Sequence, residues 1–289
     1  DMGENCDDQC RSQPVKISVG SDFSCALMGT GEVRCWGSNH LGQLGDPTKE
    51  EVYTTVATRV VGIDQASDIS AGDDHVCAVK EGQVWCWGRT EASQLLRLPA
   101  GDASVRQIPN LTNAHAVVAG KNRTCAIVGP QRQLRCWGAG YLGNGNTQDS
   151  ATPVTVRLQA QRGPLFTSIA SVAVGSAHAC AVRSERGIAL GTYCWGEDTL
   201  GQLGNGGRDG PRPPSPESPF AALVARGSPV LAGVRAGAAG TCGLTASGNP
   251  YLYCWGSNRN SYLGLPSDDS TTLPIRMDIG RIDNSAYDL

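Results

Sequence analysis

Apolar and polar positions alternate along this chain in short runs, and the same arrangement returns five times. Each repeat begins with an apolar run and a polar turn, followed by a run of the type Cys-Ala-Leu, a hairpin loop and a run ending in Cys-Trp-Gly. Short runs bounded by turn residues are typical of β-strands. A loop such as Leu-Gly-Gln-Leu-Gly then leads to a more variable run, so each repeat predicts four strands. The first run of each repeat ends at a glycine: Gly20, Gly72, Gly120, Gly175 or Gly237.

The repeat length predicts the architecture. A four-stranded unit cannot bury both faces of its small sheet alone, so neighbouring units must stack. We therefore predict an all-β fold, a five-bladed β-propeller over residues 15–289, preceded by a cysteine-containing extension over residues 1–14. The tryptophans of the Cys-Trp-Gly triplets recur every 50 to 60 residues, at Trp36, Trp87, Trp137, Trp195 and Trp255.

The end of the chain predicts how the propeller closes. Residues 273–279 form a strand-like run with no repeat after it. We expect this C-terminal strand to pair into the first blade, because closure removes the exposed sheet edges that favour aggregation. An open solenoid is the alternative.

Ten of the twelve cysteines stand at equivalent places in the second and third strands of each repeat. A separation of 9 to 14 residues suits two opposed positions of one hairpin, whose Cα atoms lie about 4.5 Å apart. The spacing therefore predicts one disulfide per blade. The expected pairs are Cys25–Cys35, Cys77–Cys86, Cys125–Cys136, Cys180–Cys194 and Cys242–Cys254.

Zinc is the competing interpretation of a cysteine array. Structural zinc sites use closely spaced cysteine pairs, and here Cys6 and Cys10 alone come near that spacing. We expect no metal and no cofactor. For Cys6 and Cys10 a small-loop bridge is the simplest expectation, and a bond to another chain is the alternative.

Charge and cysteine content narrow the function classes. The net charge is −3 and no basic stripe is present, which argues against binding nucleic acid. An even, regular set of cysteines argues for an oxidising compartment, hence a secreted or cell-surface protein. No 18-residue apolar run is present, so we expect no membrane span. A first residue Asp1 predicts a mature or trimmed chain whose targeting segment is gone.

The repeats resemble those of the regulator of chromosome condensation family. The likeness rests on the turn after the glycine, the small-Ala-Leu strand, Trp-Gly and Gly-Gln-Leu-Gly, and it covers nearly all of residues 15–289. It implies a β-propeller. The founding member is similar in its repeat, but it is a nuclear exchange factor that binds chromatin, and the cysteines and acidic charge of this chain differ from it.

Extracellular members of the family are more similar, because they carry cysteine-rich repeats of this kind. The ectodomains of crinkly-type receptor kinases and secreted bacterial Cys-Trp-Gly repeat proteins resemble this chain, and a β-lactamase inhibitory protein with this fold shows that such a propeller can bind an enzyme. These relatives often have seven blades, whereas five repeats are counted here. Function depends on sites carried by a fold, so the resemblance predicts binding without naming a partner.

The turns after the repeat glycines form one natural binding surface, because a closed propeller would bring them to one face. The family resemblance also implies a structural alternative for His75 and His178, in which each histidine forms hydrogen bonds within its own turn. Trp85 stands outside the Cys-Trp-Gly triplets and is a further candidate contact. The chain has no Gly-x-Ser-x-Gly or His-Glu-x-x-His motif, so we predict no catalytic residue. The candidate surface comprises Asp22, Phe23, Asp74, His75, Trp85, Arg123 and His178.

Three further features could shape the surface. Asn110 and Asn122 begin glycosylation sequons, which would place them on accessible surface in a secreted protein. Residues 206–219 are rich in Gly, Pro and Arg and read either as a solvated insertion or as a binding loop. The hairpin over residues 183–192 is longer than its counterparts in the other repeats.

The leading functional hypothesis is an extracellular, non-catalytic module for protein recognition or structural assembly, as in an adhesin, a receptor ectodomain or a surface filament. The alternatives are a soluble enzyme inhibitor and a carbohydrate-binding lectin. Varied turn residues count against five equivalent sugar pockets. The expected partner is a protein or a second copy bound at a propeller face, or a glycan.

Overall fold

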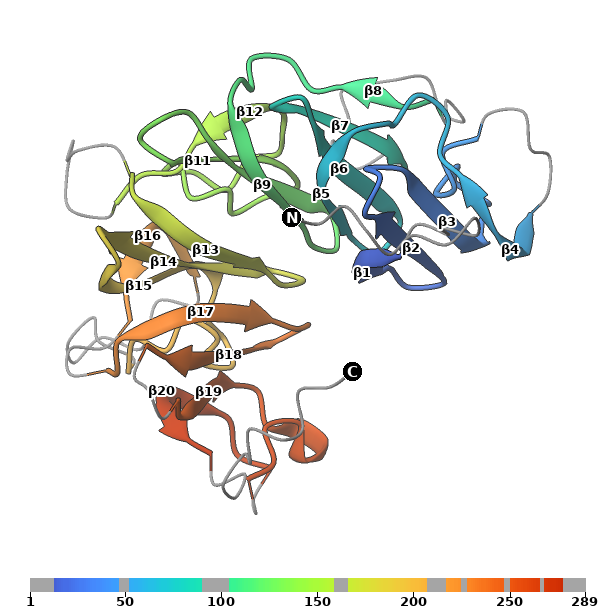
Figure 1. Cartoon of the computed structure of the whole chain (residues 1–289). Coiled ribbons are helices and arrows are strands. Elements are labelled where there is room, and N and C mark those ends of the chain that lie inside the picture. The colour runs from blue at the N-terminus through green and yellow to red at the C-terminus, as the bar shows by residue number, and fades with distance from the viewer. Residues whose placement is uncertain are drawn as a thin grey trace, which may run out of the picture.

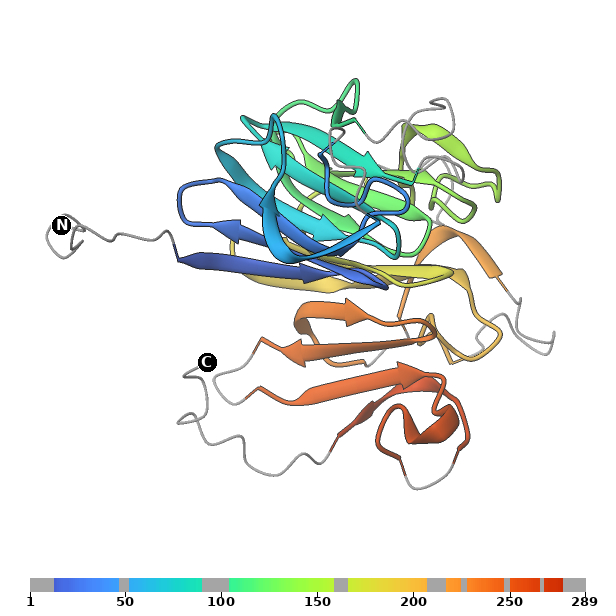
Figure 2. The ribbon, with the colours of Figure 1, turned by 90° about the vertical axis from the view of Figure 1, so that its right-hand side faces the viewer.

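The computed structural model describes residues 13–46, 52–89, 104–158, 166–206, 217–224, 228–246, 250–265 and 268–277. These residues form five separate antiparallel sheets of four strands each. Figure 1 shows the sheets arranged as blades around a common centre, and Figure 2 shows them stacked on one another. The predicted all-β propeller with four-stranded blades is confirmed.

Each blade takes its four strands from consecutive sequence. Blade 1 contains β1 (Pro14–Val19), β2 (Phe23–Met28), β3 (Val33–Ser38) and β4 (Tyr53–Arg59). Blade 2 contains β5 (Ala66–Ala71), β6 (His75–Lys80), β7 (Gln83–Gly88) and β8 (Arg106–Gln107). Blade 3 contains β9 (Ala114–Ala119), β10 (Arg123–Val128), β11 (Gln133–Gly138) and β12 (Ser150–Thr155).

The last two blades follow the same order. Blade 4 contains β13 (Ile169–Val174), β14 (His178–Glu185), β15 (Ile188–Glu197) and β16 (Glu217–Leu223). Blade 5 contains β17 (Leu231–Ala236), β18 (Gly240–Thr245), β19 (Leu252–Gly256) and β20 (Thr271–Arg276). A short 3₁₀ turn, η1 (Arg259–Ser261), lies between β19 and β20.

The C-terminal strand does not close the ring. β20 pairs with β19 through Cys254 and Ile275, so it completes the fifth blade, and the prediction that it enters the first blade was wrong. The physical reason is that the first repeat supplies its own outer strand, β4, which occupies the position beside β3. Figure 1 shows the blades as an arc with an opening between β17–β20 and β1–β4.

The predicted hairpin disulfides are present in all five blades. In each blade the two cysteines are directly opposed across the second and third strands, with Cα atoms 4.1 Å apart. Each bridge closes a short loop and is expected to contribute about 2–3 kcal/mol by restricting the unfolded chain. The expected Cys6–Cys10 pair, and residues 1–12 of the predicted N-terminal extension, lie outside the described residues.

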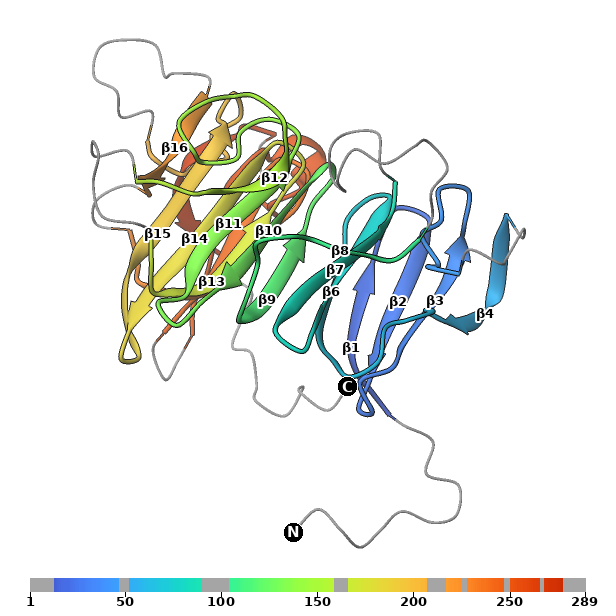
Figure 3. The ribbon, with the colours of Figure 1, turned by 90° about the horizontal axis from the view of Figure 1, so that it is seen from above.

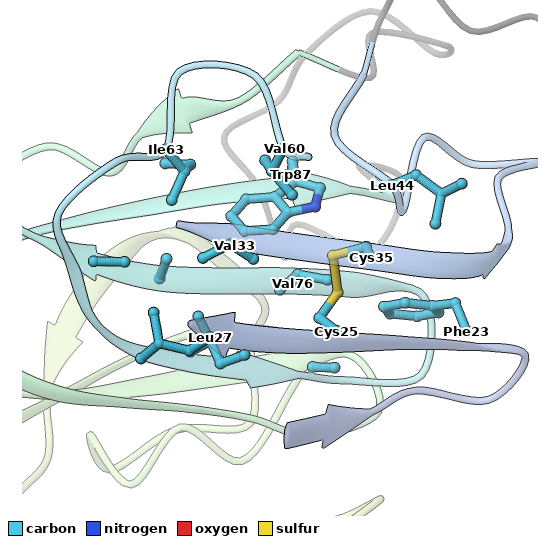
Figure 4. Packing of buried hydrophobic residues seen from close by; sticks show 14 residues of the cluster. Phe23, Cys25, Leu27, Val33, Cys35, Leu44, Val60, Ile63, Val76 and Trp87 are labelled. Atoms are coloured by element: carbon cyan, nitrogen blue, oxygen red, sulfur yellow. A yellow bond between two sulfur atoms is a disulfide. The ribbon is translucent and has the colours of Figure 1, made fainter. Parts of the chain in front are cut away.

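The core is divided into four clusters, each lying between two neighbouring blades. Figure 4 shows the first of these, where the Cys25–Cys35 bridge and Leu27 of blade 1 face Val76 and Trp87 of blade 2. The disulfide face of one blade therefore packs on the tryptophan face of the next. Because each blade touches its neighbours in this way, stability depends on nearest-neighbour interfaces.

The loop after the third strand fastens the interface between blades 1 and 2 and that between blades 4 and 5. The indole Nε1 of Trp87 in blade 2 donates a hydrogen bond to the backbone carbonyl of Gln43 in blade 1, 2.9 Å away. The carbonyl of Gln202 in blade 4 accepts the equivalent bond from Trp255 of blade 5 at 2.8 Å. The Leu-Gly-Gln-Leu-Gly motif thus has a structural role, since its backbone receives the tryptophan of the following blade.

Candidate functional site

The turns between first and second strands form one ring of candidate contacts. Each turn is closed by the same backbone hydrogen bond from the repeat glycine, such as Gly72 N to His75 O at 2.8 Å. The glycines let neighbouring blades approach closely, because a Cβ at Gly72 would lie 2.1 Å from the carbonyl oxygen of Gly120. The tips of this ring carry mixed charge, with Asp22 and Lys121 exposed.

Phe23, His75, Arg123 and His178 are buried and do not form a binding surface. Each is the first residue of the second strand, two residues before the bridged cysteine, so it faces the next blade together with that cysteine. The prediction that these four side chains contact a partner was therefore wrong.

Two of these side chains join adjacent blades by buried hydrogen bonds. His75 Nε2 lies 2.7 Å from Thr124 Oγ1, and His178 Nε2 lies 2.8 Å from Thr241 Oγ1. Burial lowers the pKa of each imidazole to about 4. The Nδ1 atoms of both rings have no hydrogen-bond partner among the described residues, so a proton added there would be buried without compensation.

These histidines predict acid sensitivity. Each pKa is lower in the folded chain than the usual 6.5, so the unfolded chain binds more protons below that pH. The stabilising contribution is complete above pH 6.5 and is lost as the pH falls toward 4. We expect a loss of up to about 3 kcal/mol for each histidine, measured as the free energy of unfolding between pH 7.5 and pH 4.5.

A glutamine variant is the matched control for this prediction. In His75→Gln/His178→Gln an amide nitrogen can replace each Nε2 without titrating. The pH dependence over this range should become flatter than in the parent chain. An unchanged slope would show that other groups cause the acid sensitivity.

Arg123 occupies the same repeat position in blade 3. Burial lowers the pKa of its guanidinium to about 10, opposed by Tyr141, Asp149 and Glu197. One terminal nitrogen donates a hydrogen bond to the Tyr141 carbonyl at 3.4 Å. The charge is thus held inside the blade 3 interface and is not presented to a partner.

The other candidate contacts are half-buried or exposed. Asp74 forms an ion pair with Arg89 at 3.1 Å, and Asp22 is exposed. Trp85 packs against the cluster between blades 1 and 2, with the Lys80 ammonium 5.7 Å from its ring centroid. Trp85 therefore has a packing role and an accessible edge.

The hairpins between second and third strands lie at the opposite end of the blades from the turn ring, since the strands are antiparallel. The β14–β15 hairpin is the longest, with ten residues in β15, and it is drawn in yellow at the molecular edge in Figure 3. Ile188 and Leu190 near its tip are 69% and 43% exposed. The sequence already distinguishes this hairpin by its length. The exposed side chains of Ile188 and Leu190 make it a candidate for contact with a partner.

The remaining predicted features have varied positions. Asn110 is exposed, whereas Asn122 is half-buried and the Thr124 of its sequon is buried against His75. Of the segment 206–219, residues 207–216 lie outside the described part, and the last three residues belong to β16.

The described residues carry neither a candidate metal cluster nor a candidate membrane helix. No group of three or more His, Cys, Asp or Glu side chains is placed to hold a metal ion there. Within the same residues, no helix is long and apolar enough to cross a membrane.

Comparison with known proteins finds the repeat directly. The model of the regulator of chromosome condensation (RCC1) repeat matches residues 15–43 and 66–94, and a second model of that repeat matches residues 30–79. The chain is 29% identical over 277 residues to the Ultraviolet-B receptor UVR8 of Arabidopsis thaliana. The aligned region covers 92% of this chain and 58% of UVR8.

Solved structures agree on the fold. Yeast RCC1 (Prp20), solved bound to Kap60, matches with a TM-score of 0.75 at 20% identity, over 95% of this chain and 62% of that one. The ectodomain of the Physcomitrella patens receptor kinase CR4 matches with a TM-score of 0.52 at 21% identity, over 86% and 53%. This chain thus spans less than two thirds of each of these relatives.

Proposed function

We propose, from the premise that this chain is built of regulator of chromosome condensation repeats, that it is an extracellular, non-catalytic protein-recognition module. The observation that carries the proposal is the β14–β15 hairpin, which holds exposed apolar side chains on a scaffold with one disulfide in each blade. Loops on rigid scaffolds are common binding sites.

The energetics of this hairpin favour a protein partner. Ile188 and Leu190 can each contribute about 1.5–3 kcal/mol when an interface covers them fully. The Cys180–Cys194 bridge fixes the base of the hairpin, so little conformational entropy is lost on binding. An apolar tip of this kind suits a protein surface better than a sugar.

The five bridges support the extracellular part of the proposal, because disulfides persist in oxidising compartments. A role in adhesion, as a receptor ectodomain or in a surface assembly is consistent with the likeness to the CR4 ectodomain. Yeast RCC1 bound to Kap60 is an example of this fold in a protein complex.

The test is capture of labelled cell-surface proteins on the immobilised chain. The Ile188→Ser/Leu190→Ser variant should retain the captured partner at least about tenfold more weakly with an unchanged melting temperature. Val61→Ser removes an apolar side chain that is 54% exposed elsewhere and should bind like the parent. Equal capture by all three chains, or no specific capture, would contradict the proposal.

A further inference from the structure

Two arginines meet at the interface between blades 3 and 4, at the base of the β14–β15 hairpin. Arg132 lies between β10 and β11 of blade 3, and Arg183 lies in β14 of blade 4. The Nε atom of Arg132 donates a hydrogen bond to the Ile169 carbonyl at 2.7 Å, and that of Arg183 donates to the Thr167 carbonyl at 3.0 Å. One short backbone segment therefore holds both guanidinium groups, and its two accepting carbonyls are at most about 7 Å apart.

These two positive charges have no acidic partner among the described residues. The ion pairs that those residues form lie in and between blades 1 and 2, where Arg34, Arg59 and Arg89 each contact a carboxylate. Arg132 and Arg183 are half-buried, and their terminal nitrogens donate no hydrogen bond to the part of the chain that the structure describes. A guanidinium fixed through Nε still presents its terminal donors, which suit a carboxylate.

The backbone of Arg132 has a conformation that favours glycine. Its φ is 49°, in the left-handed region, where a side chain costs free energy. Its carbonyl accepts a hydrogen bond from Ile169 N of the next blade, and the carbonyls of Gly31 and Gly82 accept the equivalent bond in blades 1 and 2. Blade 3 thus has an arginine where those blades have glycine. Such local strain is concentrated at functional sites, which indicates a role for the Arg132 side chain.

The end of the β14–β15 hairpin places an apolar side chain on the same face as Arg183. Strand alternation puts Arg183 and Glu185 on the face of Ala181, which packs in the cluster between blades 3 and 4. Ile188 is paired with Glu185 across the hairpin, so it shares this face, and it is 69% exposed. Arg186 at the tip adds a further positive charge, against one carboxylate, Glu185, in the hairpin. The exposed apolar side chain therefore lies in a region of net positive charge.

We propose that Arg132 and Arg183 bind the carboxylates of an acidic protein segment whose apolar side chains cover Ile188. This inference rests on the proposed function, because it names the chemistry of the partner at the same hairpin. Apolar contacts that exclude water strengthen the charge pairs beside them. The exposed Ile188 favours a protein segment over a sulfated polysaccharide, which carries charges and hydroxyl groups but no apolar side chains.

The test uses a fluorescein-labelled peptide of alternating leucine and glutamate, and a second peptide in which glutamine replaces glutamate. Fluorescence anisotropy in about 50 mM salt should show that the parent chain binds the glutamate peptide at least about tenfold more tightly, and about 500 mM salt should remove most of the difference. Arg183→Gln should weaken binding of the glutamate peptide at least about fivefold. Lys121→Gln, which removes an exposed charge at the opposite end of the blades, should bind like the parent.

Arg132→Gly separates binding from structure. Glycine adopts the left-handed conformation without strain, so the melting temperature should not fall, whereas affinity for the glutamate peptide should fall at least about fivefold. A role confined to the hydrogen bond with Ile169 would instead lower the melting temperature and leave the affinity unchanged.

Glu185→Gln should change binding in the opposite direction. It removes the carboxylate that competes for these arginines, so the glutamate peptide should bind about twofold more tightly or better. Weaker binding by this variant would show that Glu185 itself contacts the peptide and that the positive charge does not select it, which would overturn the proposal.

Equal binding of the two peptides, binding of neither, or unchanged affinity in Arg183→Gln would overturn the proposal. Preferential binding of a heparin oligosaccharide through the same arginines would also overturn it, because the occupant would then be a sulfated glycan.

These outcomes are distinct from a failure of the proposed function. A cell-surface partner that the parent captures through Ile188 and Leu190, and that Arg132→Gly and Arg183→Gln retain equally well, would support the function and contradict the arginine site. Arginine-dependent binding of the glutamate peptide without capture of any cell-surface protein would support the arginine site and contradict the function.

Discussion

Replacing Trp87 by alanine is expected to destabilise the protein by about 4 kcal/mol, which corresponds to a fall in melting temperature of about 10 °C. The indole is fully buried between blades 1 and 2. Its removal leaves a cavity and also leaves the Gln43 carbonyl without the indole hydrogen bond. Equilibrium denaturation measures the loss directly.

Trp36 provides the matched control for this substitution. It has the same place in its repeat, but it is half-buried and no loop among the described residues receives it. Trp36→Ala should therefore cost about 1 kcal/mol. Equal losses for the two variants would show that the tryptophans stabilise their own blades and not the interfaces between blades.

Reduction of the disulfides is expected to unfold the chain. Five bridges at about 2–3 kcal/mol each contribute about as much as the whole stability of a typical domain, 5–15 kcal/mol. Circular dichroism in increasing reductant should show a cooperative loss of the β signal at 25 °C. A reduced chain that keeps its melting temperature would show that stacking alone holds the blades.

The strand plan and the bridges could be predicted because they depend on local spacing. The cysteines are 9 to 14 residues apart, and hairpin pairing fixes which positions are opposed. The number of strands in each blade follows from the same repeat. Neither prediction needs knowledge of how blades are placed around the centre.

The candidate surface was less predictable, although part of the signal was present. Phe23 and His75 adjoin polar turns, which suggested exposure. Strand alternation places them on the face of Cys25 and Cys77, two residues on, and counting back from the buried cysteines would have found this. The role of the Gln43 carbonyl could not be read from the sequence, since a backbone acceptor carries no side-chain signal.

The prediction of ring closure failed for a different reason. The sequence prediction places residues 273–279 in the first blade because no repeat follows them. The variable segment Tyr53–Arg59 already fills that position, but its polar and apolar residues give a weak pattern. Which sheet an outer strand joins depends on contacts distant in sequence, and local periodicity does not report them.

Peptide mapping of the unreduced protein by mass spectrometry tests whether each blade holds its own disulfide. We expect five linked peptide pairs, each joining the two cysteines of a single hairpin, as in Cys77 with Cys86 and Cys180 with Cys194. Free thiols at these positions, or links between different repeats, would contradict the hairpin disulfide of each blade. They would also contradict the oxidising compartment inferred from those disulfides.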